Sequence, residues 1–126
     1  MKKADTKKIL LLFDDRLQAA TMSQILLLNK YEVVQAKDRR EAITVVKKTR
    51  PDLIIVDSQN KETDKSEILK SMRSTPQARR IPFLIVVEAK GQIPEGDTNG
   101  PPEHSLVRPF TREQLAITVQ KILKRS

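Results

Sequence analysis

Two short apolar runs, residues 9–13 and 53–56, constrain the fold of this chain most, because each ends directly in aspartate. Runs of this length, rich in branched side chains and flanked by polar residues, are typical of buried parallel strands. In an open α/β sheet, ligands bind just beyond the carboxyl ends of such strands. The two runs therefore predict that the carboxylates of Asp14, Asp15 and Asp57 share one crevice.

Three carboxylates in one crevice repel one another unless a cation offsets their charge. Mg²⁺ prefers a few carboxylates together with water and phosphate oxygens. The cluster therefore favours a site for a hard divalent metal and a phosphoryl group. Taken singly, each aspartate also has a simpler interpretation, as a helix N-cap or as a solvated residue at a strand end.

Apolar runs and amphipathic segments alternate along the chain, which predicts an α/β fold with a doubly wound, five-stranded parallel sheet. In the helix expected at residues 16–30, we expect Leu17, Met22, Ile25 and Leu26 to face the sheet. The expected strands are residues 8–13, 32–36, 52–56, 82–87 and a short fifth around Leu106 and Val107. Three further helices are expected. The first follows an N-cap at Asp38, the second spans residues 64–74, and the third follows an N-cap at Thr111.

Residues 88–105 interrupt this alternation where a fourth crossover helix would be expected. All 3 glycines of the chain lie there, together with Pro94, Pro101 and Pro102. Neither residue type supports a helix interior, so we expect a flexible loop or one short turn in place of the helix. We interpret the whole chain, residues 1–126, as a single domain with a basic N-terminal extension at residues 1–7.

Composition limits the function classes. A chain of 126 residues without cysteine suits one domain without disulfides or thiolate metal sites, and no apolar stretch approaches the roughly 18 residues of a membrane span. We therefore expect a soluble cytoplasmic protein. The net charge of +8 raises the question of anionic partners, but with 3 Phe and 1 Tyr the basic clusters lack interleaved aromatic residues. Nucleic acid is consequently not an expected partner.

Four motifs stand in a fixed order: Asp14-Asp15, Pro-Asp-Leu-Ile-Ile-Val-Asp at residues 51–57, Ile-Pro-Phe-Leu-Ile-Val at residues 81–86, and Arg108 followed by Pro-Phe. With them, the chain resembles the receiver domain of bacterial two-component response regulators, over nearly its whole length. The resemblance implies a flavodoxin-like sheet order. It also implies that the bond between Arg108 and Pro109 is cis.

By this resemblance, Asp57 accepts a phosphoryl group from a histidine kinase or phosphotransfer protein. Asp15 would bind Mg²⁺ directly, Asp14 would bind it through water, and Gln59 would contribute its backbone carbonyl. Beyond phosphoryl transfer to and from Asp57 itself, we expect no enzymatic activity, because no other nucleophile with an adjacent base and no phosphate loop is present.

The departures from the family pattern fall on residues that read out the phosphorylated state. Val87 stands where the family has Thr or Ser, and it cannot donate a hydrogen bond to a phosphoryl oxygen. Ser105 stands where the family has an aromatic residue. Arg108 replaces the family lysine; it either grips Asp57 as a planar fork or merely offsets the acidic cluster. Lys61 and Lys65 replace a proline and a glycine in the loop after Asp57.

Three hypotheses follow. The first is a phosphoacceptor domain that works through Asp57 and Mg²⁺. The second is a phosphorylation-independent pseudo-receiver that acts as a protein interaction module, because Val87, Ser105 and Arg108 all lie on the path from site to output surface. The third, with the least support, is a basic protein that binds nucleic acid or another anionic surface. A homodimer and the identity of the output partner stay open.

Overall fold

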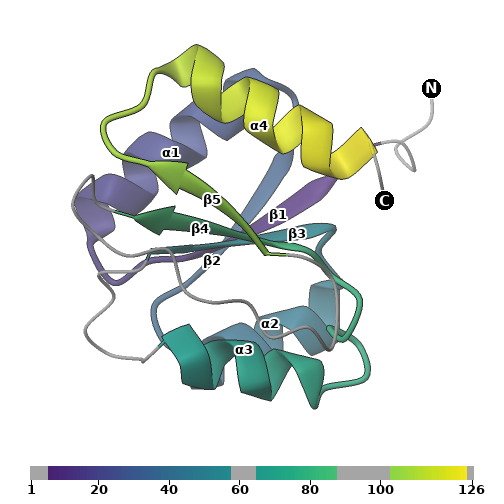
Figure 1. Cartoon of the computed structure of the whole chain (residues 1–126). Helices are drawn as coiled ribbons and strands as arrows, with labels where there is room; N and C mark the ends of the chain where they lie inside the picture. Colours follow the sequence, from purple (N-terminus) through teal and green to yellow (C-terminus); the bar gives the residue numbers. More distant parts are fainter. Residues whose placement is uncertain (1–5, 58–64, 88–102, 125–126) are drawn as a thin grey trace.

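The computed structural model describes residues 6–57, 65–87 and 103–124 (Figure 1). Strands and helices alternate as expected up to the fourth strand. The strands are β1 (Lys8–Leu12), β2 (Glu32–Ala36), β3 (Leu53–Asp57), β4 (Phe83–Val87) and β5 (Glu103–Val107). The helices are α1 (Arg16–Leu28), α2 (Arg39–Thr49), α3 (Lys65–Arg73) and α4 (Arg112–Lys124).

The five strands form one parallel sheet in the order β2-β1-β3-β4-β5. Helices α1 and α4 cover one face of the sheet, and α2 and α3 cover the other (Figure 1). This is the predicted doubly wound α/β architecture. All strands run in the same direction, so their carboxyl ends lie along one edge.

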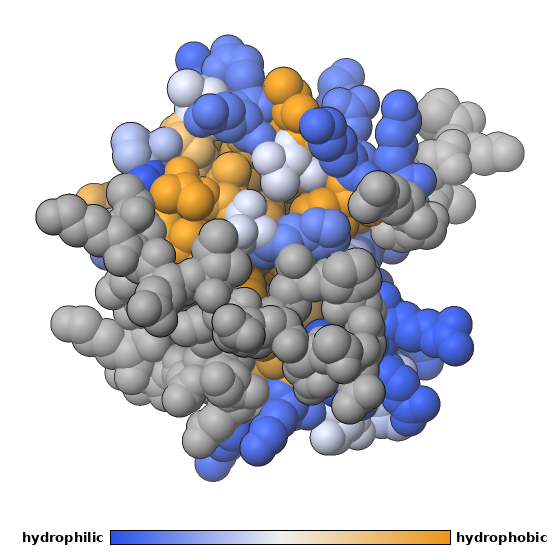
Figure 2. Space-filling model, in the orientation of Figure 1, coloured by the Kyte–Doolittle hydropathy of each residue, from blue (hydrophilic) through white to orange (hydrophobic). Residues whose placement is uncertain are grey.

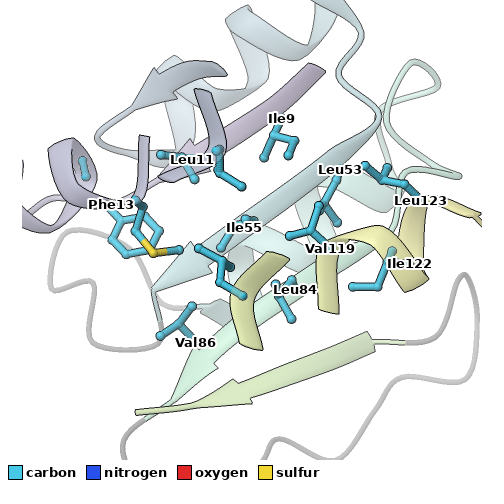
Figure 3. Close-up of a cluster of buried hydrophobic side chains, with 14 residues drawn as sticks. Ile9, Leu11, Phe13, Leu53, Ile55, Leu84, Val86, Val119, Ile122 and Leu123 are labelled. Atoms are coloured by element: carbon cyan, nitrogen blue, oxygen red, sulfur yellow. The ribbon is translucent and has the colours of Figure 1, made fainter. Parts of the chain in front are cut away.

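Burial on both faces explains why the strand sequences are continuously apolar rather than alternating. Within β1, Ile9 and Leu11 face α1 and α4, while Leu10 and Leu12 face α2 and α3, and all four are fully buried. Figure 3 shows the first of these clusters, in which strand side chains meet Val119, Ile122 and Leu123 of α4. Each such aliphatic side chain contributes about 1.5–3 kcal/mol through burial.

Helix α1 corrects one expectation. Met22 and Leu26 are buried and Ile25 packs against the same cluster, as predicted, but Leu17 is 78% exposed. Leu17 lies in the first turn, beyond the carboxyl edge of the sheet, so no strand lies beneath it. The helix also ends at Leu28 rather than at Lys30, because Lys30 has a positive φ of 71°.

The fifth strand is longer than predicted. It begins at Glu103, so residues 103–105 belong to β5 and not to the expected loop. β5 forms the outer edge of the sheet, where polar side chains are tolerated, and its sequence therefore lacks the apolar signature of the inner strands. The rest of that predicted loop, residues 88–102, lies outside the described residues.

Side-chain caps set the starts of two helices where the sequence predicts them. Asp38 accepts a hydrogen bond from the backbone N of Glu41 at 2.9 Å, and this fixes the first turn of α2. Thr111 and Gln114 bond reciprocally at 2.8 and 3.0 Å and form a capping box before α4. Among the described residues, no helix combines the length and apolar character needed to cross a bilayer.

Candidate functional site

Asp57 is the last residue of β3, and its side chain lies at the carboxyl edge of the sheet. It pairs in register with Val86 of β4, and only 2% of the residue is exposed. Among the described residues, no other carboxylate is buried. A buried carboxylate is stable only with a compensating charge or hydrogen bonds, so its partners decide what the site can do.

Arg108 supplies the compensating charge. It follows β5, and its backbone N donates to the carbonyl of Val87 at 2.8 Å, which places it beside the end of β4. Its Nη1 lies 3.4 Å from Asp57 Oδ1 and donates a hydrogen bond to it. Of the two roles that the sequence left open for Arg108, the structure shows a contact with Asp57. The bond between Arg108 and Pro109 is cis, as the resemblance implies.

Gln18 of α1 is a site residue that sequence reasoning missed. Its Oε1 accepts a hydrogen bond from Nη2 of Arg108, so the two guanidinium nitrogens join α1 to β3. The sequence carried an ambiguous signal, because an acidic cap at Asp15 followed three residues later by Gln predicts a capping box. The structure instead directs the Gln18 amide oxygen to Arg108.

Asp15 is the N-cap of α1. Its Oδ1 accepts from the backbone N of Leu17 at 2.9 Å and of Gln18 at 3.1 Å, and the residue is exposed. This is the simpler of the two interpretations that the sequence allows. The two capping hydrogen bonds use only Oδ1, so the second carboxylate oxygen of Asp15 can still bind a metal ion.

The structure places the predicted metal ligands at one edge but does not gather them into a cluster. Asp14 and Asp15 follow β1, which is paired directly with β3. Within the described ranges, no group of three His, Cys, Asp or Glu side chains is close enough to hold a metal ion. Their oxygen donors nevertheless suit Mg²⁺ chemically. Gln59, Lys61 and the side chain of Lys65 lie outside the described residues.

Val87 ends β4 and is 1% exposed, within the cluster that faces α2 and α3. It lies in register with Val107 of β5. Val87 therefore lies at the carboxyl edge of the sheet, near Asp57 and Arg108. Its side chain carries methyl groups, whereas binding a phosphoryl oxygen would need a hydroxyl. Ser105 lies two residues earlier along β5, half-buried and in register with Ile85.

A groove of about 590 Å³ lies beside the site, between α1 and the segment that leads into α4. Arg108 and Gln18 form part of its wall. The arginine that pairs with Asp57, and the glutamine that binds this arginine, are therefore accessible from the surface. The full lining is Asp15, Leu17, Gln18, Thr21, Met22, Ile25, Arg108, Phe110 and Arg112.

Comparison with known proteins decides the family. The model of the response regulator receiver domain matches residues 9–120, which include all five strands except the first residue of β1. The chain is a response regulator receiver domain. This receiver is 29% identical over 119 residues to the response regulator MprA of Mycolicibacterium vanbaalenii, and the match covers 94% of the chain and 51% of that relative. The receiver thus spans about half the length of the curated relatives it matches.

Solved structures show the same fold. The chemotaxis protein CheY4 of Vibrio cholerae is 30% identical to this receiver with a TM-score of 0.81, over 93% of this chain and 98% of that one. The receiver domain of a sensor histidine kinase from Pseudomonas aeruginosa is 22% identical with a TM-score of 0.80, over 94% and 98% of the two chains. The predicted family and flavodoxin-like sheet are therefore confirmed, and the chain belongs to a two-component signalling family.

Proposed function

We propose that this receiver accepts a phosphoryl group on Asp57. The observation that carries the proposal is the buried Asp57 carboxylate, held at the carboxyl edge of the sheet with Arg108 Nη1 3.4 Å away. In the proposed step, a carboxylate oxygen attacks the phosphorus of a donor phosphohistidine. A P–O bond forms as the P–N bond breaks, and the imidazole leaves and is protonated by solvent. Arg108 offsets part of the added negative charge.

Asp14, Asp15 and Asp57, with the backbone carbonyl of Gln59, are the residues proposed to hold Mg²⁺. When bound, Mg²⁺ offsets the charge that develops on a transferred phosphoryl group. Support comes from the oxygen donor set and from the similar Pseudomonas aeruginosa receiver, whose structure has a magnesium ion coordinated in its active-site cleft. In this proposal, Asp57 is the nucleophile of the phosphoryl transfer and the chain has no independent enzymatic activity.

The proposed donor is a histidine kinase or a phosphotransfer protein, since the family works in two-component signalling. Such a donor would meet this receiver in the cytoplasm, as the sequence predicts. The output partner of this receiver is not specified by its similarity to MprA, because the matched region is only 51% of that relative.

Acetyl phosphate with Mg²⁺ tests the phosphoacceptor proposal. Mass spectrometry should show the gain of one phosphoryl group in the parent chain and none in Asp57→Asn. Asp52→Asn is the matched control, because Asp52 lies at the opposite end of β3, where it accepts from the backbone N of Lys8 at 2.8 Å. Absence of modification in the parent, together with no spectral response to beryllofluoride, would overturn the proposal.

A phosphorylation-independent pseudo-receiver is the second candidate. The apolar burial of Val87 and the small side chain of Ser105 favour it, because neither residue provides the family's coupling between the site and the output surface. In this candidate, the ion pair between Arg108 and Asp57 holds the site permanently in one state, and partners bind whether or not Asp57 is modified.

Backbone amide spectra separate the two candidates. Beryllofluoride with Mg²⁺ should shift amides around Asp57 in both cases. If the phosphoacceptor transmits its state, shifts should also reach β5, around Ser105 and Leu106. Shifts confined to residues that contact Asp57 or Arg108 would favour the pseudo-receiver.

A further inference from the structure

Most of the basic side chains that the structure describes lie at the end where the strands begin, opposite the Asp57 site. In a doubly wound sheet, the helices run back against the strands, so helix C-termini and strand starts lie together. Sequence clusters that are far apart thereby meet at one end of the molecule. The residues are Lys7, Lys8, Lys30, Lys47, Lys48, Arg50, Lys70, Arg73, Arg79, Arg80, Lys121 and Lys124.

Backbone contacts between the strand starts fix this arrangement. The N of Glu32 donates to the carbonyl of Lys7 at 2.9 Å, and Lys8 Nζ donates to the carbonyl of Thr49 at 3.2 Å. In Figure 1 the arrows of β4 and β5 point to the left, and in Figure 2 hydrophilic side chains crowd the right-hand rim, where the strands begin.

The order of the strands arranges these charges as a row. Lys30 precedes β2, Lys7 precedes β1, Arg50 precedes β3 and Arg80 precedes β4, which is their order across the sheet. Lys121 and Lys124 line a pocket with the first residues of β5 and continue the row to the far edge. With strands about 4.8 Å apart, the row is about 20 Å long.

Among the side chains that the structure describes, two carboxylates, those of Glu32 and Asp52, accompany the twelve basic residues at this end. Glu32 and Asp52 are both engaged by Lys8, through an ion pair of 3.9 Å and a backbone hydrogen bond of 2.8 Å. At the opposite end, in contrast, the described side chains contain equal numbers of each sign. There the acidic residues are Asp14, Asp15, Asp38, Glu41, Asp57 and Glu113, and the basic residues are Arg16, Lys37, Arg39, Arg40, Arg108 and Arg112.

Helix stabilisation explains only part of the surplus. Basic residues in the last turn of a helix interact favourably with its dipole, and this account suits Lys47, Lys48, Lys70, Arg73, Lys121 and Lys124. It does not apply to Lys30, Arg79 or Arg80, which lie outside the helices and are exposed. The row therefore exceeds what the helices need.

We propose that this basic row binds the phosphate backbone of a nucleic-acid duplex without reading its sequence. A duplex carries one negative charge per about 1.7 Å with both strands counted, so a length of about 20 Å carries about twelve phosphates, and those on the side that faces the row can pair with it. Surfaces that bind nucleic acid are polar and strongly basic, whereas a protein contact needs an apolar centre. Among the described residues, the large apolar side chains exposed near this end are those of Leu27 and Leu28 in the last turn of α1, and Leu28 also lines a pocket with Arg112 and Glu113 at the start of α4.

The fold brings these basic clusters together into a row. This changes the prediction from the sequence that nucleic acid is not a partner. Taken along the chain, the clusters are short, lack aromatic neighbours and match no recognition motif. A backbone-binding surface requires neither aromatic stacking nor a motif, only exposed cations at suitable spacing. Arginine also suits phosphate, because its planar fork donates two parallel hydrogen bonds.

Fluorescence anisotropy with a labelled DNA duplex of about 20 base pairs tests the proposal, and the salt titration is its decisive part. The parent should bind with a slope of log affinity against log salt of about −4, corresponding to four or more phosphate contacts. The double variant Arg79→Gln, Arg80→Gln should bind at least about tenfold more weakly at low salt, with the slope reduced by about two.

The double variant Arg39→Gln, Arg40→Gln is the matched control, because it removes the same charge from exposed positions at the opposite end. Its affinity should change by less than about twofold. If the first variant is poorly folded by circular dichroism, Lys47→Gln, Lys48→Gln replaces it with the same expected loss. Both variants should still respond to beryllofluoride, which separates this proposal from phosphorylation of Asp57.

Three results would overturn the proposal. One is the absence of saturable DNA binding at about 50 mM salt. The second is an equal loss in the two double variants, which would indicate a general effect of net charge. The third is tighter binding to vesicles containing phosphatidylserine than to the duplex, which would assign the row to a membrane surface.

Discussion

At the residue scale, the pair of Asp57 and Arg108 determines the character of the site. The sequence pointed to both residues because they belong to ordered motifs of the family, but it left open whether Arg108 grips Asp57 or only offsets the acidic cluster. It did not predict Gln18, because the same spacing from Asp15 also fits a capping box, and only the three-dimensional position of Arg108 decides between the two. The role of a side chain can thus be predicted from the sequence when one interaction dominates, but not when two hydrogen-bond partners compete for it.

Arg108→Ala should lower the free energy of unfolding by about 3 kcal/mol, because it removes the positive charge that offsets the buried Asp57 carboxylate. The side chains are 20% and 3% exposed, so water compensates Asp57 poorly. Adding Asp57→Ala to this variant should restore part of the loss, which urea unfolding would measure. Glu32→Ala is the control. It removes a more exposed ion pair with Lys8 of 3.9 Å, and its cost should stay below about 1 kcal/mol.

Val87→Thr should destabilise the unmodified receiver by about 2 kcal/mol, because it places a hydroxyl in apolar surroundings. The same hydroxyl should bind a phosphoryl mimic at Asp57. Beryllofluoride with Mg²⁺ should therefore raise the thermal midpoint of this variant more than that of the parent. Ile85→Thr, which lies in the same cluster as Val87 but two residues further from the carboxyl edge and in register with Val56, should be destabilised without that gain. Equal gains in the two variants would show that Val87 does not meet the site.

At the element scale, the sequence predicted the inner strands and the helices well because both follow simple periodic patterns. β1, β3 and β4 are buried on both faces, so their signal is continuous and strong. β5 was underestimated because an edge strand is solvated on one side, and Leu17 was misplaced because helical periodicity does not say where the sheet ends. In both cases, the length of β5 and the exposure of Leu17, the position in the folded sheet mattered more than the local sequence preference.

Asp15 links the start of α1 to the proposed metal site, and two substitutions separate its roles. Asp15→Ala should cost about 1 kcal/mol of stability in the presence of a chelator, because the cap to the backbone N of Leu17 and Gln18 is lost. Asp15→Asn keeps an oxygen at the capping position and should cost much less, while still losing the stabilisation that Mg²⁺ gives the parent. Thermal unfolding with and without Mg²⁺ measures both. Equal behaviour of the two variants would contradict the separation.

At the scale of the whole molecule, the parallel fold separates charge that is interspersed in the sequence. Among the described side chains, the carboxyl edge carries the acidic site and equal numbers of each sign, while the opposite end carries a surplus of basic residues in a chain whose net charge is +8. Composition alone reveals the surplus but not its position. The position follows only once the strand order is known, since that order places distant clusters side by side.

This asymmetry predicts how stability depends on salt. Like charges crowded at one end repel one another in the folded state, so raising the salt from about 10 mM to about 150 mM should raise the thermal midpoint by screening them. Neutralising Arg79 and Arg80 with glutamine should raise the low-salt midpoint and flatten the salt dependence. The same change at Arg39 and Arg40, where carboxylates lie nearby, should do neither. Sodium chloride suits this titration because phosphate and sulfate would bind the row as ligands and stabilise it by mass action. If both double variants follow the parent, repulsion at the basic end is negligible and the surplus is fully solvated.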